Sequence, residues 1–339
     1  MSATDSRFNL LLWLVPAALL GVIGYVLFQT LGADTRPVPA PAPPVAQPQP
    51  QPLGFPRTLA DDSGRKLVLP AKPVRIVPGD TGMADILSAL VESQRIAALP
   101  VWVDTYGGAR EFFETNTNIS RFQKYQAEPL LALKPDLVLT DSYQDAATTS
   151  ILRQQGIPVL QFAKLRTFDG IKGAILIAGS ATGEEQKAAD LATEFDNRLQ
   201  ALAADFNGMK RPRALCYSNY GQGYAVGTGE SQDEILRRAG AENAAAEMNL
   251  AGHVTFSFEQ LLKLNPDWLI VGGDNGMQSP QAQLLLNETV LSNLQAIKER
   301  HIAVVPERYF SSISQYVVNA VEILARQLHP EAFPRRTDY

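Results

Sequence analysis

The chain contains very little cysteine. Its 339 residues include a single one, Cys216. One thiol cannot make an intrachain disulfide, a cysteine zinc site or a cysteine-ligated iron–sulfur cluster. It cannot carry an N-terminal lipid either, because a lipid-modified cysteine has to follow an apolar leader directly. We expect Cys216 to be a small buried thiol at a strand end.

Histidine and surplus positive charge are scarce as well. Three histidines are too few for a histidine-rich zinc or manganese carrier, and only His253 lies in a segment free enough to provide a ligand. The formal net charge is -5, so no basic surplus is available to neutralise phosphates. We therefore expect no metal site and no nucleic-acid partner.

Motifs of the common enzyme classes are missing. The sequence has no G-x-S-x-G, no H-E-x-x-H and no P-loop. The glycines from Gly221 to Gly227 have the wrong spacing for a dinucleotide-binding loop. We expect no catalytic residues and no bound cofactor.

A long apolar run occurs near the N-terminus. Residues 8–31 carry no charged side chain, and about 20 apolar residues suffice to cross a bilayer as a helix. A cleaved signal peptide is the alternative, but Arg7 is the only base before the run and residues 31–33 make a poor cleavage signal. We interpret residues 1–34 as a tail and an uncleaved single-pass anchor, with the remainder of the chain on the periplasmic or extracytoplasmic side.

Residues 35–56 are rich in proline and form a linker. Proline fixes φ and removes a backbone donor, so this segment forms neither helix nor sheet. As a polyproline II spacer, it holds the folded part on the order of 50 Å from the membrane.

A repeated unit organises the folded part. Residues 128–139 read E-P-L-L-A-L-K-P-D-L-V-L and residues 259–270 read E-Q-L-L-K-L-N-P-D-W-L-I. Each copy predicts a short helix that stops before proline, followed by a buried strand. Two copies predict two similar lobes, and a cleft between lobes is where small ligands usually bind.

Strands and helices alternate on both sides of a helical middle. The strand at 74–77 and the helix at 83–91, which Thr81 caps, begin the first series. Residues 171–180 and 184–206 are helical, with no strand between them. We predict an α/β fold with lobes at 57–166 and 208–339 and an interlobe helical connection at 167–207.

Two later helices begin with the same capping signature. Ser231-x-x-Glu234 and Ser257-x-x-Gln260 both have the spacing of a capping box. We expect each serine to cap its helix.

The order of these segments resembles the periplasmic solute-binding proteins of iron-siderophore, haem and vitamin B12 ABC importers. The resemblance covers about residues 57–335 and depends on the paired Glu…Leu-x-Pro-Asp units. It implies two Rossmann-like lobes joined by a long interdomain helix, with modest motion on binding. It also implies an extracytoplasmic component that delivers an iron chelate (siderophore or haem) or a corrinoid to an ABC permease with a cytoplasmic ATPase.

The resemblance assigns a docking role to the glutamate that opens each repeated unit. By position these are Glu128 and Glu259, which would pair with arginines of the permease. The alternative is a local role, because a carboxylate in the first turn of a helix is stabilised by the helix dipole.

The ligand cleft is expected at loops that follow the strands, where open α/β sheets place their ligands. Aromatic and arginine side chains in these loops suit a bulky chelate with carboxylate or catecholate oxygens. Ligation of haem by Tyr106 or His253 stays open. The predicted cleft residues are Asp80, Thr81, Trp102, Tyr106, Arg110, Tyr143, Tyr220, Tyr224, Arg308, Tyr309 and Phe310.

One alternative keeps the fold and removes the transport step. A membrane-tethered sensor or scaffold would bind the same chelate and signal. The presence of permease and ATPase genes beside this one distinguishes an importer component from such a sensor.

Overall fold

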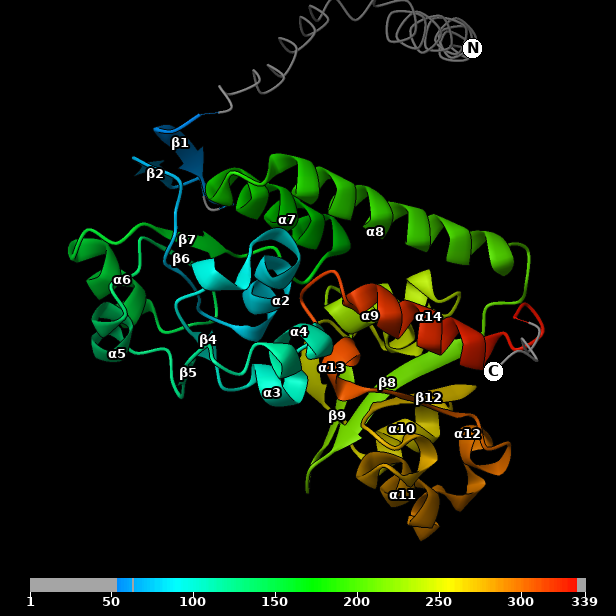
Figure 1. Ribbon diagram of the computed structural model, residues 1–339. Helices are drawn as coiled ribbons and strands as arrows, with labels where there is room; N and C mark the ends of the chain where they lie inside the picture. The colour runs from blue at the N-terminus through cyan, green and yellow to red at the C-terminus, as the bar shows by residue number, and fades with distance from the viewer. Residues whose placement is uncertain (1–53, 63, 334–339) are drawn as a thin grey trace, which may run out of the picture. The chain divides into compact units, whose positions relative to one another are not determined.

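The computed structural model describes residues 54–62 and 64–333, which belong to one compact unit (Figure 1). The predicted anchor and nearly all of the predicted linker lie outside the described residues. Within the described ranges, no helix combines the length and the apolarity required to cross a bilayer.

The first half is built on a parallel sheet in the order β3-β6-β7. These strands span Ile76–Pro78, Leu137–Asp141 and Val159–Phe162. The central strand β6 is buried along its whole length, as a parallel strand covered on both faces should be. The other elements are β1 (Arg57–Ala60), β2 (Lys66–Leu69), α2 (Thr81–Leu90), β4 (Leu99–Pro100), α3 (Val103–Tyr106), α4 (Arg110–Thr115), β5 (Arg121–Phe122), α5 (Ala127–Ala132) and α6 (Ala146–Gln154).

The second half is built on a mixed sheet in the order β11-β9-β8-β12-β13, with β10 paired to β8. β8, β12 and β13 are parallel, whereas at one edge β9 pairs antiparallel with β8 and β11 pairs antiparallel with β9. Its elements are β8 (Arg213–Asn219), β9 (Gly223–Val226), α9 (Ser231–Arg238), β10 (Glu242–Asn243), β11 (His253–Thr255), α10 (Phe258–Leu264), β12 (Trp268–Gly272), α11 (Pro280–Asn287), α12 (Gln295–Lys298), β13 (Ile302–Val305), α13 (Glu307–Phe310) and α14 (Val317–Leu328). A short 3-10 helix spans Ser93–Arg95 in the first half, and three more in the second half span Ala244–Met248, Gly276–Gln278 and Thr289–Asn293.

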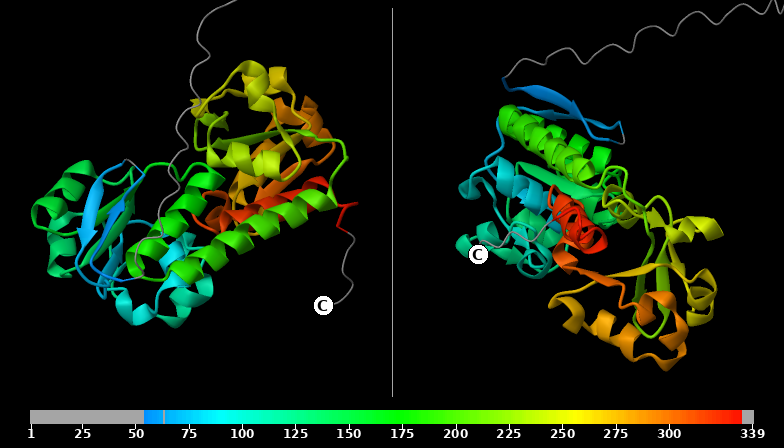
Figure 2. Two further views of the ribbon diagram at one scale, coloured as in Figure 1. Left: turned by 90° about the horizontal axis from the view of Figure 1, so that it is seen from above. Right: turned by 90° about the vertical axis from the view of Figure 1, so that its right-hand side faces the viewer.

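Two consecutive helices occupy the segment between the halves, which was predicted to be helical. α7 spans Phe168–Thr182 and α8 spans Glu185–Asp205. Figure 1 and the left view of Figure 2 show α8 passing from the first half to the second, where it packs beside α14. One apolar cluster includes residues of α2, α7, α8, β8 and α14, so the halves share a core.

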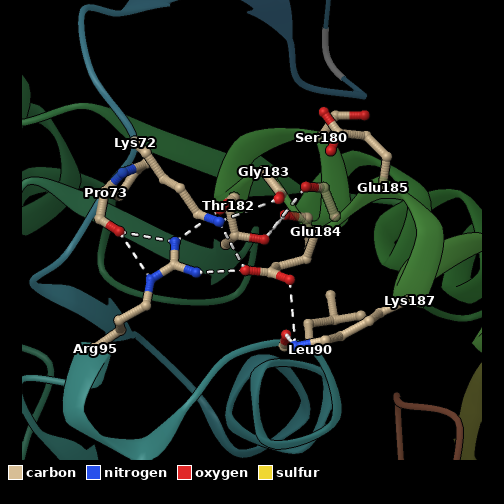
Figure 3. Close-up of polar contacts among 12 residues, drawn as sticks. Lys72, Pro73, Leu90, Arg95, Ser180, Thr182, Gly183, Glu184, Glu185 and Lys187 are labelled. Carbon is tan, nitrogen blue, oxygen red and sulfur yellow. Dashed lines mark hydrogen bonds and ion pairs between the residues drawn. The ribbon is translucent and has the colours of Figure 1, made fainter. Parts of the chain in front are cut away.

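The turn between α7 and α8 is held by charged side chains (Figure 3). The carboxylate of Glu184 lies 2.9 Å from Lys72 Nζ and 2.8 Å from Arg95 Nη1. Arg95 also donates to the carbonyl oxygens of Pro73 and Thr182, at 2.7 Å each. The segment that enters β3 is thereby fixed to the α7–α8 turn.

The repeated unit has the predicted form in both halves. α5 leads into β6 and α10 leads into β12, with a left-handed residue before each proline: Lys134 has φ 50° and Asn265 has φ 43°. Proline disfavours the α-helical region in the residue before it, so each helix ends there. The left-handed conformation suits asparagine better than lysine.

Each copy is closed by the aspartate that follows its proline. Asp136 accepts hydrogen bonds from the backbone N–H groups of Val74 and Arg75, at 2.7 and 2.9 Å, beside the start of β3. Asp267 accepts one from the N–H of Arg213, at 2.9 Å, at the start of β8. An aspartate at the equivalent position therefore joins the helix–strand unit to the first strand of the sheet in each half.

An arginine completes this closure in both copies. Arg75 donates to the carbonyl of Leu133 at 2.6 Å, and Arg213 donates to that of Leu264 at 3.0 Å. These carbonyls lie at the C-terminal ends of α5 and α10, where helical carbonyls lack intrahelical partners. The sequence contained this signal, an arginine just before β3 and another at the first position of β8, but their partners are 58 and 51 residues away.

The two predicted capping boxes have different outcomes. Ser257 caps α10, and both hydrogen bonds of the box with Gln260 are present. The prediction for Ser231 is wrong, because Glu230 is the N-cap of α9 and Ser231 is already helical.

Candidate functional site

A pocket of about 220 Å³ lies between the halves and is lined by both. Its lining begins where strands end: Thr81 comes after β3, Asp141 is the last residue of β6, and Glu307 follows β13. This is the expected position for a ligand in open α/β sheets. The lining residues are Thr81, Gly82, Asp85, Tyr106, Asp141, Glu307, Arg308, Ser311, Ser312 and Ile313.

Asp80 holds together the side of this pocket that the first half contributes. Its carboxylate caps α2 by accepting from the N–H of Met83 at 2.9 Å, and it accepts from the N–H of Asp141 at 2.8 Å. Burial and the nearby charge of Asp141 raise the pKa of Asp80 to about 7. Asp80, not Thr81, is therefore the cap of α2, and its carboxylate is engaged within the fold.

Asp85 joins the two halves at the base of the pocket. Its buried carboxylate accepts from the N–H groups of Gly108 and Ala109, at 2.9 and 3.0 Å, and from the Ser314 hydroxyl at 2.9 Å. The Gln315 amide donates to the Asp85 carbonyl at 2.8 Å. Burial raises the pKa of Asp85 to about 7, against the effect of these hydrogen bonds on the carboxylate.

Glu307 and Arg308 line the pocket from the second half. The Glu307 carboxylate accepts a hydrogen bond from the Ser311 hydroxyl and lies against Gly272. Arg308 is half-buried and also lines a neighbouring pocket of about 280 Å³. Within the described part of the chain, neither side chain forms an ion pair.

Three exposed aromatic side chains, Trp102, Tyr106 and Tyr220, form what we call the aromatic rim. The Trp102 and Tyr106 rings lie 5.9 Å apart in a tilted pair. Burial raises the pKa of Tyr220, and the nearby Glu307 and Tyr106 raise it further. Tyr220 belongs to the second half and Tyr106 to the first, so the rim has members from both halves.

The remaining predicted cleft residues lie in varied surroundings. Arg110 is exposed, pairs with Glu114 and lines the pocket of about 280 Å³ and a further one of about 530 Å³. Tyr143 is exposed and lies 4.8 Å from the guanidinium of Arg166, which stacks over its ring. Tyr224 and Tyr309 are half-buried, whereas Phe310 is buried against Gly272 and belongs to the core.

The sequence prediction missed Asp85, Glu307 and the serine pair at 311 and 312. Glu307 was detectable, because it directly precedes the predicted Arg308 in the segment that follows β13. Asp85 was not, because it lies inside a helix and its importance comes from a residue more than two hundred positions away.

Glu128 and Glu259 occupy equivalent positions in the two halves. Each is exposed in the first turn of its helix, α5 or α10. Neither carboxylate has a hydrogen-bond or ion-pair partner among residues 54–62 and 64–333. In Figure 1, α5 and α10 both lie on the side away from α7 and α8.

The fold and the pocket define an α/β protein of the ligand-binding type, with a site where strands of two sheets end. The chain belongs to the periplasmic binding protein family, whose sequence profile matches residues 76–309. The cobalamin-binding protein of Halobacterium salinarum is 25% identical over 279 residues, which cover 81% of this chain and 74% of that protein. The ABC transporter substrate-binding lipoprotein YvrC of Bacillus subtilis, itself uncharacterised, is 24% identical over 290 residues, with 82% and 87% covered.

Solved structures support the same fold. The periplasmic haem-binding protein RhuT from Roseiflexus sp. RS-1 has a TM-score of 0.66 at 21% identity, over 76% of this chain and 98% of that one. MolA of Haemophilus influenzae, bound to molybdate, has a TM-score of 0.68 at 22% identity, over 82% and 92%. At these identities the likeness establishes the fold alone.

Proposed function

We propose that this chain is the extracytoplasmic substrate-binding component of an ABC importer, which captures an iron chelate or a corrinoid between two lobes. The pocket lined from both halves is the observation that carries the proposal, because it lies where strands of both sheets end. Family membership supports it, as does the similarity to the cobalamin-binding protein of Halobacterium salinarum. In this role the chain binds and delivers its ligand without chemical conversion.

The pocket is small for such a ligand. A volume of about 220 Å³ lies below the roughly 300–1,000 Å³ of pockets that enclose drug-sized molecules. We infer that a bulky chelate rests on the aromatic rim at the mouth and directs only its polar groups into the pocket. Flat aromatic side chains provide large contact area at low entropic cost.

Docking to the permease would use Glu128 and Glu259. A permease with two like halves matches two equivalent exposed carboxylates, and exposed charge pairs contribute orientation and association rate more than affinity. The predicted N-terminal anchor and proline-rich linker would keep the folded unit close to this partner.

Equilibrium dialysis of the full chain against cyanocobalamin, haemin and a ferric siderophore tests the proposal. We expect one of the three to be retained. Replacing Trp102 by leucine should weaken its binding by about two- to tenfold, the range expected for an aromatic contact.

The matched control is Trp268→Leu. Trp268 lies at the opposite, amino end of β12, where it stacks on His301 at 4.4 Å. Its replacement should leave ligand binding unchanged. Retention of none of the three ligands would contradict the proposed function.

A further inference from the structure

Acidic side chains outnumber basic ones in the lining of the pocket between the halves. Asp85, Asp141 and Glu307 line it, and Arg308 is the one base in this lining. The neighbouring pocket adds no surplus of positive charge, because two arginines there already have carboxylate partners. Arg110 pairs with Glu114, and Arg121 pairs with Asp104 at 3.1 Å.

Different amounts of hydrogen-bonding capacity remain on these side chains. The carboxylate of Asp85 is occupied by its three donors. One oxygen of Asp141 accepts from the N–H groups of Tyr143 and Gln144, at 2.7 and 3.0 Å. Arg308, by contrast, has no hydrogen bond or ion pair with any described residue.

One oxygen of Glu307 accepts from the Ser311 hydroxyl, and no described residue donates to the other. Glu307 and Arg308 are therefore the pair best placed to contact a ligand. Each is half-buried and lines the pocket, and their charges are not neutralised by ion pairs within the described ranges. An ionised carboxylate only accepts hydrogen bonds and a guanidinium only donates them. A complementary ligand must offer hydrogen-bond donors to one and a single acceptor or anionic group to the other.

We propose that this site selects a chelate that carries several hydrogen-bond donors and no more than one anionic group. An amide-bearing corrinoid with one phosphodiester has this chemistry: its amides donate to Glu307 and Asp141, and its phosphodiester accepts from Arg308. Haem has two carboxylates, and a ferric tricatecholate has three negative charges. In those ligands the additional anions would face the pocket carboxylates without a cation. The inference rests on the proposed function and names the ligand class for that site.

Competition among probes of different charge tests the inference. Full-length protein is dialysed against cyanocobalamin, haemin, a ferric tricatecholate and molybdate. Cyanocobalamin should bind at least about tenfold more tightly than each of the others, a difference of about 1.4 kcal/mol.

Two substitutions separate the contributions of the pair. Glu307→Gln should weaken cyanocobalamin and strengthen the anionic probes, each by about tenfold, because it removes a negative charge and keeps the shape. Arg308→Gln should weaken cyanocobalamin and weaken the anionic probes further still. Glu194→Gln, an exposed substitution on α8, is the control and should change neither.

The outcomes distinguish this inference from the proposed function. If an anionic probe binds most tightly, or if Glu307→Gln leaves the ranking of the probes unchanged, the charge selection is wrong and the binding function stands. If all four probes pass through unretained, both the inference and the proposed function are overturned.

Discussion

Replacing Asp85 by asparagine should stabilise the protein at alkaline pH. The asparagine side chain has nearly the same shape: its Oδ1 can accept from the N–H groups of Gly108 and Ala109, and its Nδ2 can donate to the Ser314 hydroxyl. The substitution removes a carboxylate from a position that is 1% exposed. It thereby separates the cost of the buried charge from the value of the hydrogen bonds.

The sign follows from the raised pKa of Asp85. Burial raises it from 3.8 to about 7, so the folded protein holds this proton more tightly than the unfolded chain does. The stabilising contribution is complete below pH 3.8 and is lost as the pH rises through 7. A shift of this size corresponds to about 4 kcal/mol in total, of which about 3 kcal/mol is lost between about pH 5 and pH 8.

Urea unfolding followed by far-UV circular dichroism at about pH 5 and pH 8 measures the effect. The free energy of unfolding of Asp85→Asn, relative to wild type, should rise by about 3 kcal/mol between these two pH values. Some pH dependence should remain, because burial raises the pKa of Asp80 to about 7 as well. Carboxylates with a lowered pKa, such as Glu184 and Glu322, titrate below this window.

A second variant tests the hydrogen bonds themselves. Asp85→Ala removes the acceptor for three buried donors, and each unsatisfied donor costs about 1–3 kcal/mol. This variant should be less stable than wild type at both pH values. The reasoning is refuted if Asp85→Asn shows the full wild-type pH dependence, or if it destabilises the protein at the higher pH as much as alanine does.

Three other predictions concern the repeated units and the thiol. Substituting Glu128 or Glu259 by alanine should reduce ligand uptake into cells severalfold and leave ligand affinity unchanged, whereas Glu194→Ala should affect neither; unchanged uptake would favour the sensor alternative. Lys134→Asn, which reproduces the asparagine of the second copy, should raise the free energy of unfolding by about 0.5–1 kcal/mol, because asparagine tolerates left-handed φ. A lower free energy of unfolding, measured by urea denaturation, would contradict this. Burial raises the pKa of Cys216, so it should resist maleimide in the native protein and react in urea; rapid native labelling would show that the thiol is accessible.

The helical middle and the repeated unit were predictable because their signals are local. Periodic apolar residues predicted α7 and α8, and proline predicted the ends of α5 and α10. The left-handed conformation of Lys134 and Asn265 was not predicted, because the same constraint favours an extended residue before proline. The hydrogen bonds of the aspartate and the arginine in each unit were not predicted, because they join segments distant in the chain.

The two capping serines show where local reasoning fails. Both have the spacing of a capping box, but Ser257 alone forms one. Before Ser231 stands Glu230, whose carboxylate is held by Arg166 at 2.6 Å and lies 3.7 Å from His253. These partners come from distant parts of the chain, and Glu230 takes the N-cap position that the sequence pattern assigned to Ser231.

The candidate site was predictable in its position more than in its chemistry. Because their residues follow predicted strands, the aromatic rim and Arg308 were assigned to the cleft from the sequence. The same reasoning placed Asp80 and Phe310 in the cleft, although the fold uses the Asp80 carboxylate as a helix cap and buries the Phe310 ring. Whether a side chain after a strand faces a ligand or the core depends on packing, such as that of Phe310 against Gly272.

Hydrogen–deuterium exchange of the full chain, with and without the retained ligand, tests most directly whether the ligand lies between the two halves. Bound ligand should protect backbone amides in residues 81–85 and 102–108 of the first half and in residues 307–313 of the second. It should leave α11, which contributes nothing to the pocket lining, unchanged. Protection confined to one half, or centred on α11, would contradict binding between the lobes.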